Sequence, residues 1–76
     1  MATVPRSPEG SDQSFTIEFE QEKNGQWLAE VLELPGVMVY GNTREDAEVK
    51  VTALALRVIA DHTEQVKKPP KSIKFL

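Results

Sequence analysis

Apolar and polar side chains alternate along residues 14–22. Phe15, Ile17 and Phe19 fall on one side and Thr16, Glu18 and Glu20 on the other. A period of two, carried by aromatic and β-branched residues, indicates a half-buried strand. Residues 26–32 repeat the pattern, with Trp27, Ala29 and Val31 on one face and Leu28, Glu30 and Leu32 on the other.

The turn between these strands, Lys23-Asn24-Gly25, sets their register. A two-residue Asn-Gly turn would place Phe19 opposite Glu30, whereas a three-residue loop with Gly25 at positive φ places Phe19 opposite Ala29. Cross-strand partners share a face of the sheet, so only the longer loop collects the apolar residues on one side. We therefore predict the three-residue loop.

The second half of the chain predicts a short strand, a helix and a final strand. Leu34-Pro35-Gly36 interrupts the alternation before a strand at residues 37–40. Thr43 is the expected N-cap of a helix from Arg44 to about Thr63, because acidic residues fill its first turn and apolar residues recur at helical spacing. Pro69-Pro70 ends the helical pattern, and residues 72–76 form the last strand.

The predicted fold class is α+β, a two-layer β-β-β-α-β sandwich with one helix on one face of a four-stranded sheet. A right-handed crossover would place the last strand parallel to the first. Since one helix covers one face, the other face is expected to be open. Leu28, Met38 and Tyr40 should emerge there together with Glu18, Glu20 and Glu30, and an exposed cluster with an aromatic residue is typical of an interface.

Length and composition limit the class of protein. The chain has 76 residues, no cysteine and a net charge of -3, which predicts one domain over residues 14–76 after a disordered tail at 1–13. Without disulfides, a core this small is commonly supplemented by oligomerisation, so we expect a dimer or larger assembly. Neither a signal peptide nor a run of roughly 20 apolar residues occurs, and a cytoplasmic location is expected.

Candidate chemistry is sparse. His62 is the single histidine, and metal sites need several converging ligands, so no catalytic, cofactor or metal residues are predicted. One carboxylate cluster is expected on the open face, formed by Glu18, Glu20, Glu30 and Glu33. It is either an ordinary solvated surface or a charged surface that binds a partner. Four lysines near the C-terminus are a weak indication of nucleic-acid binding. The acidic first half of the chain would repel phosphates, so direct binding of nucleic acid is not expected.

Three linked motifs resemble HicB-type antitoxins. They are Gly25-Gln26-Trp27-Leu28-Ala29-Glu30, then Glu33-Leu34-Pro35-Gly36-Val37, then the segment from Tyr40 to Ala47 with Gly41-Asn42-Thr43 at the helix start. The resemblance covers residues 14–76. It implies a partial RNase H-like fold without the nuclease carboxylates.

The resemblance also implies a function. Such domains bind a small HicA-type toxin, an mRNA-cleaving enzyme, and block its active site. The partner-binding residues Glu18, Glu20, Leu28, Glu30, Met38 and Tyr40 are inferred from the predicted face and are not a motif of the family. Complete relatives carry an additional DNA-binding domain, which the resemblance does not include here. The alternative is a stand-alone oligomeric interaction or regulatory module without a toxin partner.

Overall fold

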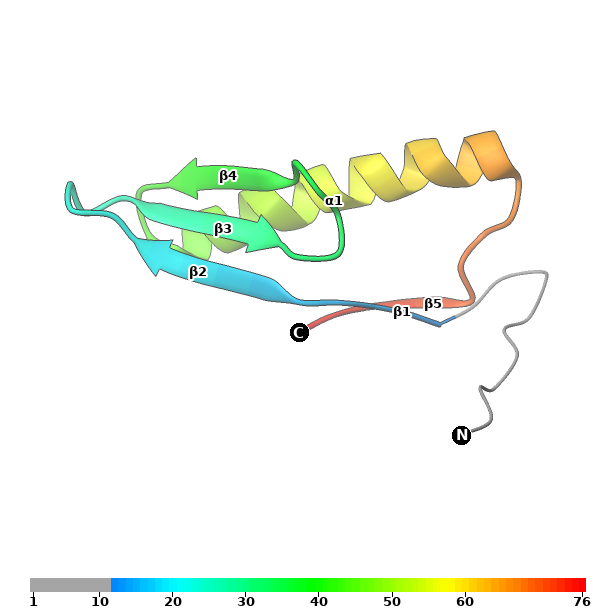
Figure 1. Ribbon diagram of the computed structural model, residues 1–76, viewed down its shortest axis with the longest axis horizontal. Helices are drawn as coiled ribbons and strands as arrows, with labels where there is room; N and C mark the ends of the chain where they lie inside the picture. Colours follow the sequence, from blue (N-terminus) through cyan, green and yellow to red (C-terminus); the bar gives the residue numbers. More distant parts are fainter. Residues whose placement is uncertain (1–11) are drawn as a thin grey trace.

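A computed structural model describes residues 12–76 as an α+β domain in which a single long helix lies against a mixed β structure (Figure 1). The expected tail lies outside the described residues, except that residues 12 and 13 already belong to the first strand. In chain order the elements are β1 (Asp12–Phe15), β2 (Ile17–Gln21), β3 (Trp27–Val31), β4 (Met38–Gly41), α1 (Arg44–Val66) and β5 (Ser72–Phe75). None of these described elements is a helix with the length and apolar character needed to cross a membrane.

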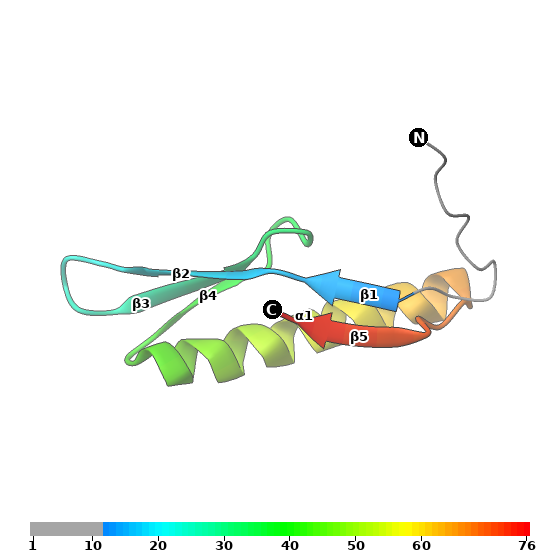
Figure 2. The same ribbon diagram turned by 90° about the horizontal axis from the view of Figure 1, so that it is seen from below.

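The strands form two groups. β2, β3 and β4 make an antiparallel sheet, and β1 pairs with β5 in parallel. The parallel partnership of the first and last strands agrees with the sequence prediction, but the single four-stranded sheet was wrong. The predicted strand at 14–22 is divided at Thr16 into β1 and β2, which follow one another almost in line (Figure 2).

The β2–β3 hairpin has the predicted register. Ile17 pairs with Val31 and Phe19 with Ala29. Gly25 has φ +90°, and the amide of Glu22 donates to the carbonyl of Gln26 at 2.7 Å, which closes the three-residue loop. The positive φ explains why glycine suits this position. The prediction from shared faces is thereby confirmed.

The core lies between α1 and the facing side of the strands. Its buried side chains are Phe15, Ala29, Val31, Val37, Ala47, Val51 and Ala55. Three are alanines with no exposed surface, and the largest fully buried residues are Val31 and Val51. Small side chains let the helix lie close to β3 and β4, so the core is thin.

At Gly41 the end of β4 lies directly against the first turns of α1. A Cβ atom at this position would lie 2.5 Å from the backbone nitrogen of Ala47 and 2.8 Å from its Cα. Both atoms belong to the backbone of Ala47, so they cannot move aside by a change of side-chain rotamer. A side chain at position 41 would therefore push the first turn of α1 off β4.

Both ends of α1 are capped. The Oγ1 atom of Thr43 accepts a hydrogen bond from the amide of Asp46 at 2.9 Å, which confirms the predicted N-cap. The Asp46 carboxylate accepts from the amide of Asn42 at 3.0 Å, so the reciprocal bond reaches one residue before the cap. The helix continues to Val66, and Lys67 ends it in the left-handed conformation, with its amide donating to the carbonyl of Thr63 at 2.7 Å.

We predict that Gly41→Ala lowers the free energy of unfolding by about 1–3 kcal/mol, the usual cost of overpacking. Urea denaturation monitored by circular dichroism measures it. Gly36→Ala is the control, because Gly36 has φ +87° and open space around it, and its cost comes from backbone strain alone. A loss at position 41 no larger than at position 36 would contradict the close-packing argument.

Candidate functional site

The six residues inferred from sequence lie in two adjacent cross-strand rows. The register aligns Glu18 with Glu30 and Met38, and Glu20 with Leu28 and Tyr40. Cross-strand neighbours share a face, so all six lie on the side of β2–β4 that α1 does not cover. In Figure 1 the helix passes behind these strands, and Figure 2 shows it as a layer on one side only. We call this surface the open face.

The open face changes character from strand to strand. Carboxylates occupy β2, a carboxylate and a leucine occupy β3, and Met38 and Tyr40 occupy β4. Met38 is 47% exposed and Tyr40 52% exposed, whereas Leu28 between them and Glu20 is half-buried. Neighbouring strands lie about 4.8 Å apart, so the acidic and apolar columns are separated by about 10 Å. A complementary surface would carry basic groups at that distance from an apolar contact.

The acidic column contains an unfavourable pair. Glu18 and Glu30 are direct cross-strand partners, and like charges in this position destabilise a sheet. Within residues 12–76 the described salt bridge joins Lys50 and Asp46 on α1, and no ion pair neutralises these two glutamates. Their charge is therefore available to a molecule outside the domain.

Glu33, the fourth carboxylate of the predicted cluster, contacts the junction between β1 and β2. Its carboxylate oxygens accept a hydrogen bond from the backbone amide of Thr16 at 2.8 Å and one from the Thr16 hydroxyl at 2.9 Å. The backbone hydrogen bond from Thr16, ahead of a smaller opposing effect of desolvation, holds the pKa of Glu33 below its ordinary value. Glu33 thus satisfies the amide at the interruption between β1 and β2.

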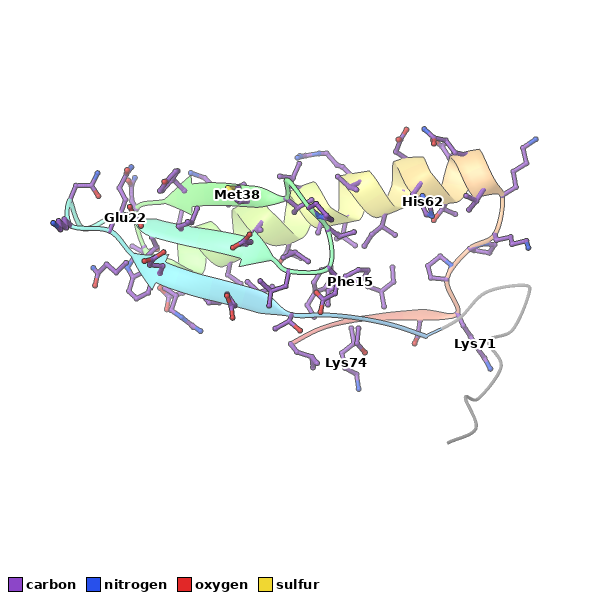
Figure 3. All side chains as sticks on the ribbon, in the orientation of Figure 1. Phe15, Glu22, Met38, His62, Lys71 and Lys74 are labelled. Atoms are coloured by element: carbon purple, nitrogen blue, oxygen red, sulfur yellow. The ribbon has the colours of Figure 1, made fainter. Side chains whose placement is uncertain are left out.

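The remaining polar candidates lie elsewhere. His62 is exposed on α1, and Lys71 and Lys74 are exposed at the β5 side of the molecule (Figure 3). Among the described residues, no three His, Cys, Asp or Glu side chains converge in a way that could hold a metal ion. In Figure 3, Glu22 at the β2–β3 turn and Lys71 before β5 lie toward opposite ends of the long axis. Lys71 therefore lies far from the acidic end of the β2–β3 hairpin.

Sequence reasoning placed Leu32 on the face of Leu28 and Glu30 but left it out of the site, and it missed an exposed surface on the helix. Leu32, directly after β3, is 46% exposed. Its alternation with Leu28 and Glu30 was the signal. On α1, Val49 is 69% exposed and Leu56 is 45% exposed, although neither belongs to the apolar stripe that identified the helix.

Comparison of the chain with models of protein families, with curated proteins and with solved structures finds no match. The interpretation of the open face therefore rests on its own geometry and on the motifs of the sequence.

The Glu33 contact generates a prediction about pH. Because the pKa of Glu33 is lowered in the folded state from an ordinary value of 4.5, its ionised carboxylate stabilises the fold above that pH. The contribution is lost as pH falls through the folded-state pKa. Glu33→Ala should therefore lower the Tm at pH 7, and the difference from the native chain should shrink at pH 3.

Thermal unfolding by circular dichroism at the two pH values measures this difference. The matched control, Glu18→Ala, removes a carboxylate that opposes Glu30 and should leave the Tm at pH 7 unchanged or raise it. An equal Tm for Glu33→Ala and the native chain at pH 7 would show that the carboxylate does not hold the strand junction.

Proposed function

We propose that this domain is a non-catalytic, antitoxin-like binding domain that neutralises a HicA-type mRNA-cleaving toxin by covering its active site. The observation that carries the proposal is the arrangement of three carboxylates and three apolar side chains in two adjacent rows of one uncovered sheet face. The linked motifs between Gly25 and Ala47 support the choice of partner.

The charge of the open face suits an enzyme that cleaves RNA. Such an enzyme must hold a polyanion, so its substrate surface is basic. Glu18, Glu20 and Glu30 offer a complementary field, which accelerates encounter and fixes the relative orientation of two proteins. An occluding partner that uses acidic side chains competes directly with the phosphates of the substrate.

The apolar column supplies surface that can be buried against the partner, which electrostatic attraction alone does not provide. Aromatic residues and methionine are enriched at the centres of interfaces, where they are desolvated by a rim of polar groups. Tyr40 and Met38 are about half exposed in the isolated domain and therefore have surface left to bury. We assign them the central contact and assign the glutamates the rim.

We also propose that the domain has a partial RNase H-like fold and that it is located in the cytoplasm. The order β-β-β-α-β, with the first strand interrupted, supports a partial RNase H-like domain. An inhibitor of mRNA cleavage works in the cytoplasm, where translated mRNA is found.

The experiment is co-expression in bacteria with a toxin encoded beside the gene. The native chain should restore growth and co-purify with the toxin. Tyr40→Glu should abolish rescue, since losing a central aromatic contact costs about 2 kcal/mol or more, roughly a thirtyfold weaker complex. Glu20→Lys should slow association and weaken its salt dependence, because it lowers the negative charge of the face from three to one.

The matched control is Glu48→Lys, which makes the same charge reversal at an exposed position on α1, in the other layer of the domain. It should rescue growth as the native chain does. Unrescued growth with the native chain, together with no co-purification, would remove the toxin from the proposal.

A second function, a stand-alone oligomeric interaction module, is favoured by the exposure of Met38 and Tyr40. In that case the open face would meet another copy of the chain. Light scattering of Tyr40→Glu would then report a smaller mass than that of the native chain, whereas an unchanged mass would count against self-association through this patch.

A further inference from the structure

The outward side of α1 carries a seam without charge. Val49, Leu56 and Thr63 recur every seven residues, and Thr52, Ala53 and Ala60 lie between them. Seven residues are nearly two helical turns, so these side chains form one stripe about 21 Å long. The two large ones are well exposed, Val49 at 69% and Leu56 at 45%.

This seam points away from the sheet. The core side of the helix is defined by Ala47, Val51 and Ala55, which are all fully buried. Positions 49, 56 and 63 lie roughly opposite on a helix of 3.6 residues per turn. In Figure 2 the N-terminal half of α1 has no other element on the side away from β2, β3 and β4.

When two copies of α1 run antiparallel, the charged residues beside the seam of one helix lie near residues of opposite charge on the other helix. If Leu56 meets its own copy, Val49 faces Thr63, and Lys50 comes beside Glu64 of the other helix. The acidic first turn, Glu45 and Asp46, then approaches Lys67 and Lys68 at the other helix's end. A parallel pairing would instead leave Lys50 far along the axis from Glu64, and the acidic first turn far from Lys67 and Lys68. Arg57 is the exception, because it lies near the two-fold axis.

We propose that two copies of the chain associate back to back through this seam, with their α1 helices antiparallel and Leu56 at the two-fold axis. The small residues Ala53 and Ala60 allow close approach of the two backbones. The arrangement is independent of the toxin proposal, because it uses the opposite layer of the domain. Both open faces remain on the outside, so one dimer presents two acidic and apolar surfaces.

The thin core gives a reason for such a contact. Only seven side chains of the described residues are buried apolar groups, whereas α1 alone exposes Val49, Leu56, Val58 and Val66 substantially. A domain of this length buries a smaller fraction of its unfolded surface than a larger domain does, and association is a common way to add burial.

The first test is the mass of the 76-residue chain in solution, measured by light scattering and sedimentation velocity. The native chain should have twice its 8.5 kDa mass. Leu56→Glu should be a monomer, with a dimer dissociation constant raised at least tenfold and an unchanged circular dichroism spectrum. Tyr40→Glu, on the opposite layer, should stay dimeric.

A charge exchange tests the antiparallel direction without altering the seam. Lys50→Glu should weaken the dimer, and adding Glu64→Lys to the same chain should restore it. Failure of the second substitution to restore the dimer would overturn the assigned direction.

Cysteine cross-linking locates the axis. The native chain contains no cysteine, so each variant carries one reactive thiol. Leu56→Cys should form a disulfide dimer under mild oxidation, because the two thiols meet at the axis. Val49→Cys should cross-link poorly, although Val49 is the more exposed residue and would react faster in random collisions.

Besides a failed charge exchange, three results would overturn the proposal. They are a monomeric native chain at all concentrations, a dimer that Tyr40→Glu abolishes and Leu56→Glu does not, and faster cross-linking at position 49 than at position 56. None of them bears on toxin rescue, which the open-face variants report separately.

Discussion

The close packing of α1 against β3 and β4 determines what the rest of the molecule can be. Ala29, Ala47 and Ala55 lie at the contact with no exposed surface, and Gly41 leaves no room for a methyl group beneath the first turn of the helix. Because these residues are small, the layers approach closely and the interior holds few large side chains. The helix is held at its start by its capped N-terminus and by Arg44, whose guanidinium lies 4.0 Å from the centre of the Phe19 ring. Such cation–π contacts add modestly to stability.

A single helix in this position leaves two surfaces without a partner, the open face of the sheet and the outer side of the helix. They differ in chemistry. The open face combines carboxylates with a tyrosine and a methionine, and it includes the repelling pair Glu18 and Glu30. The helix seam is uncharged and has self-complementary flanks. The open face would repel a second copy of itself and is suited to a basic partner. The helix seam complements a second copy of itself. This difference is the reason for assigning a partner protein to the first surface and self-association to the second.

Much of the fold could be predicted from local patterns. The register of β2 and β3 followed from requiring the apolar residues to share a face, and the start of α1 followed from a threonine before an acidic turn. The parallel pairing of β1 and β5 followed from the handedness of crossovers. These features depend on neighbours in sequence or on rules common to all sheets.

The features that were wrong have two causes, a contact between distant residues and an unusual local conformation. Thr16 interrupts the first strand because its amide donates to Glu33, which is 17 residues away, and the alternation of residues 14–22 contains no sign of it. The end of α1 was set too early because Lys67, which is neither glycine nor asparagine, adopts the left-handed conformation that stops the helix. The helix seam could be interpreted only after the buried side of α1 was known.

The pairing of β1 with β5 also has a consequence for the order in which the chain folds. The β2–β3–β4 meander and α1 are contiguous in sequence, so their contacts can form as soon as these residues leave the ribosome. β1 is made before all of them, yet its partner is made last, and the Phe15 and Phe75 rings meet at 5.6 Å only when β5 has arrived. During synthesis, β1 therefore stays without its hydrogen-bonding partner until β5 has been made. The open face belongs to the part that is complete earlier, so a nascent chain could present its acidic and apolar rows before its last strand is in place.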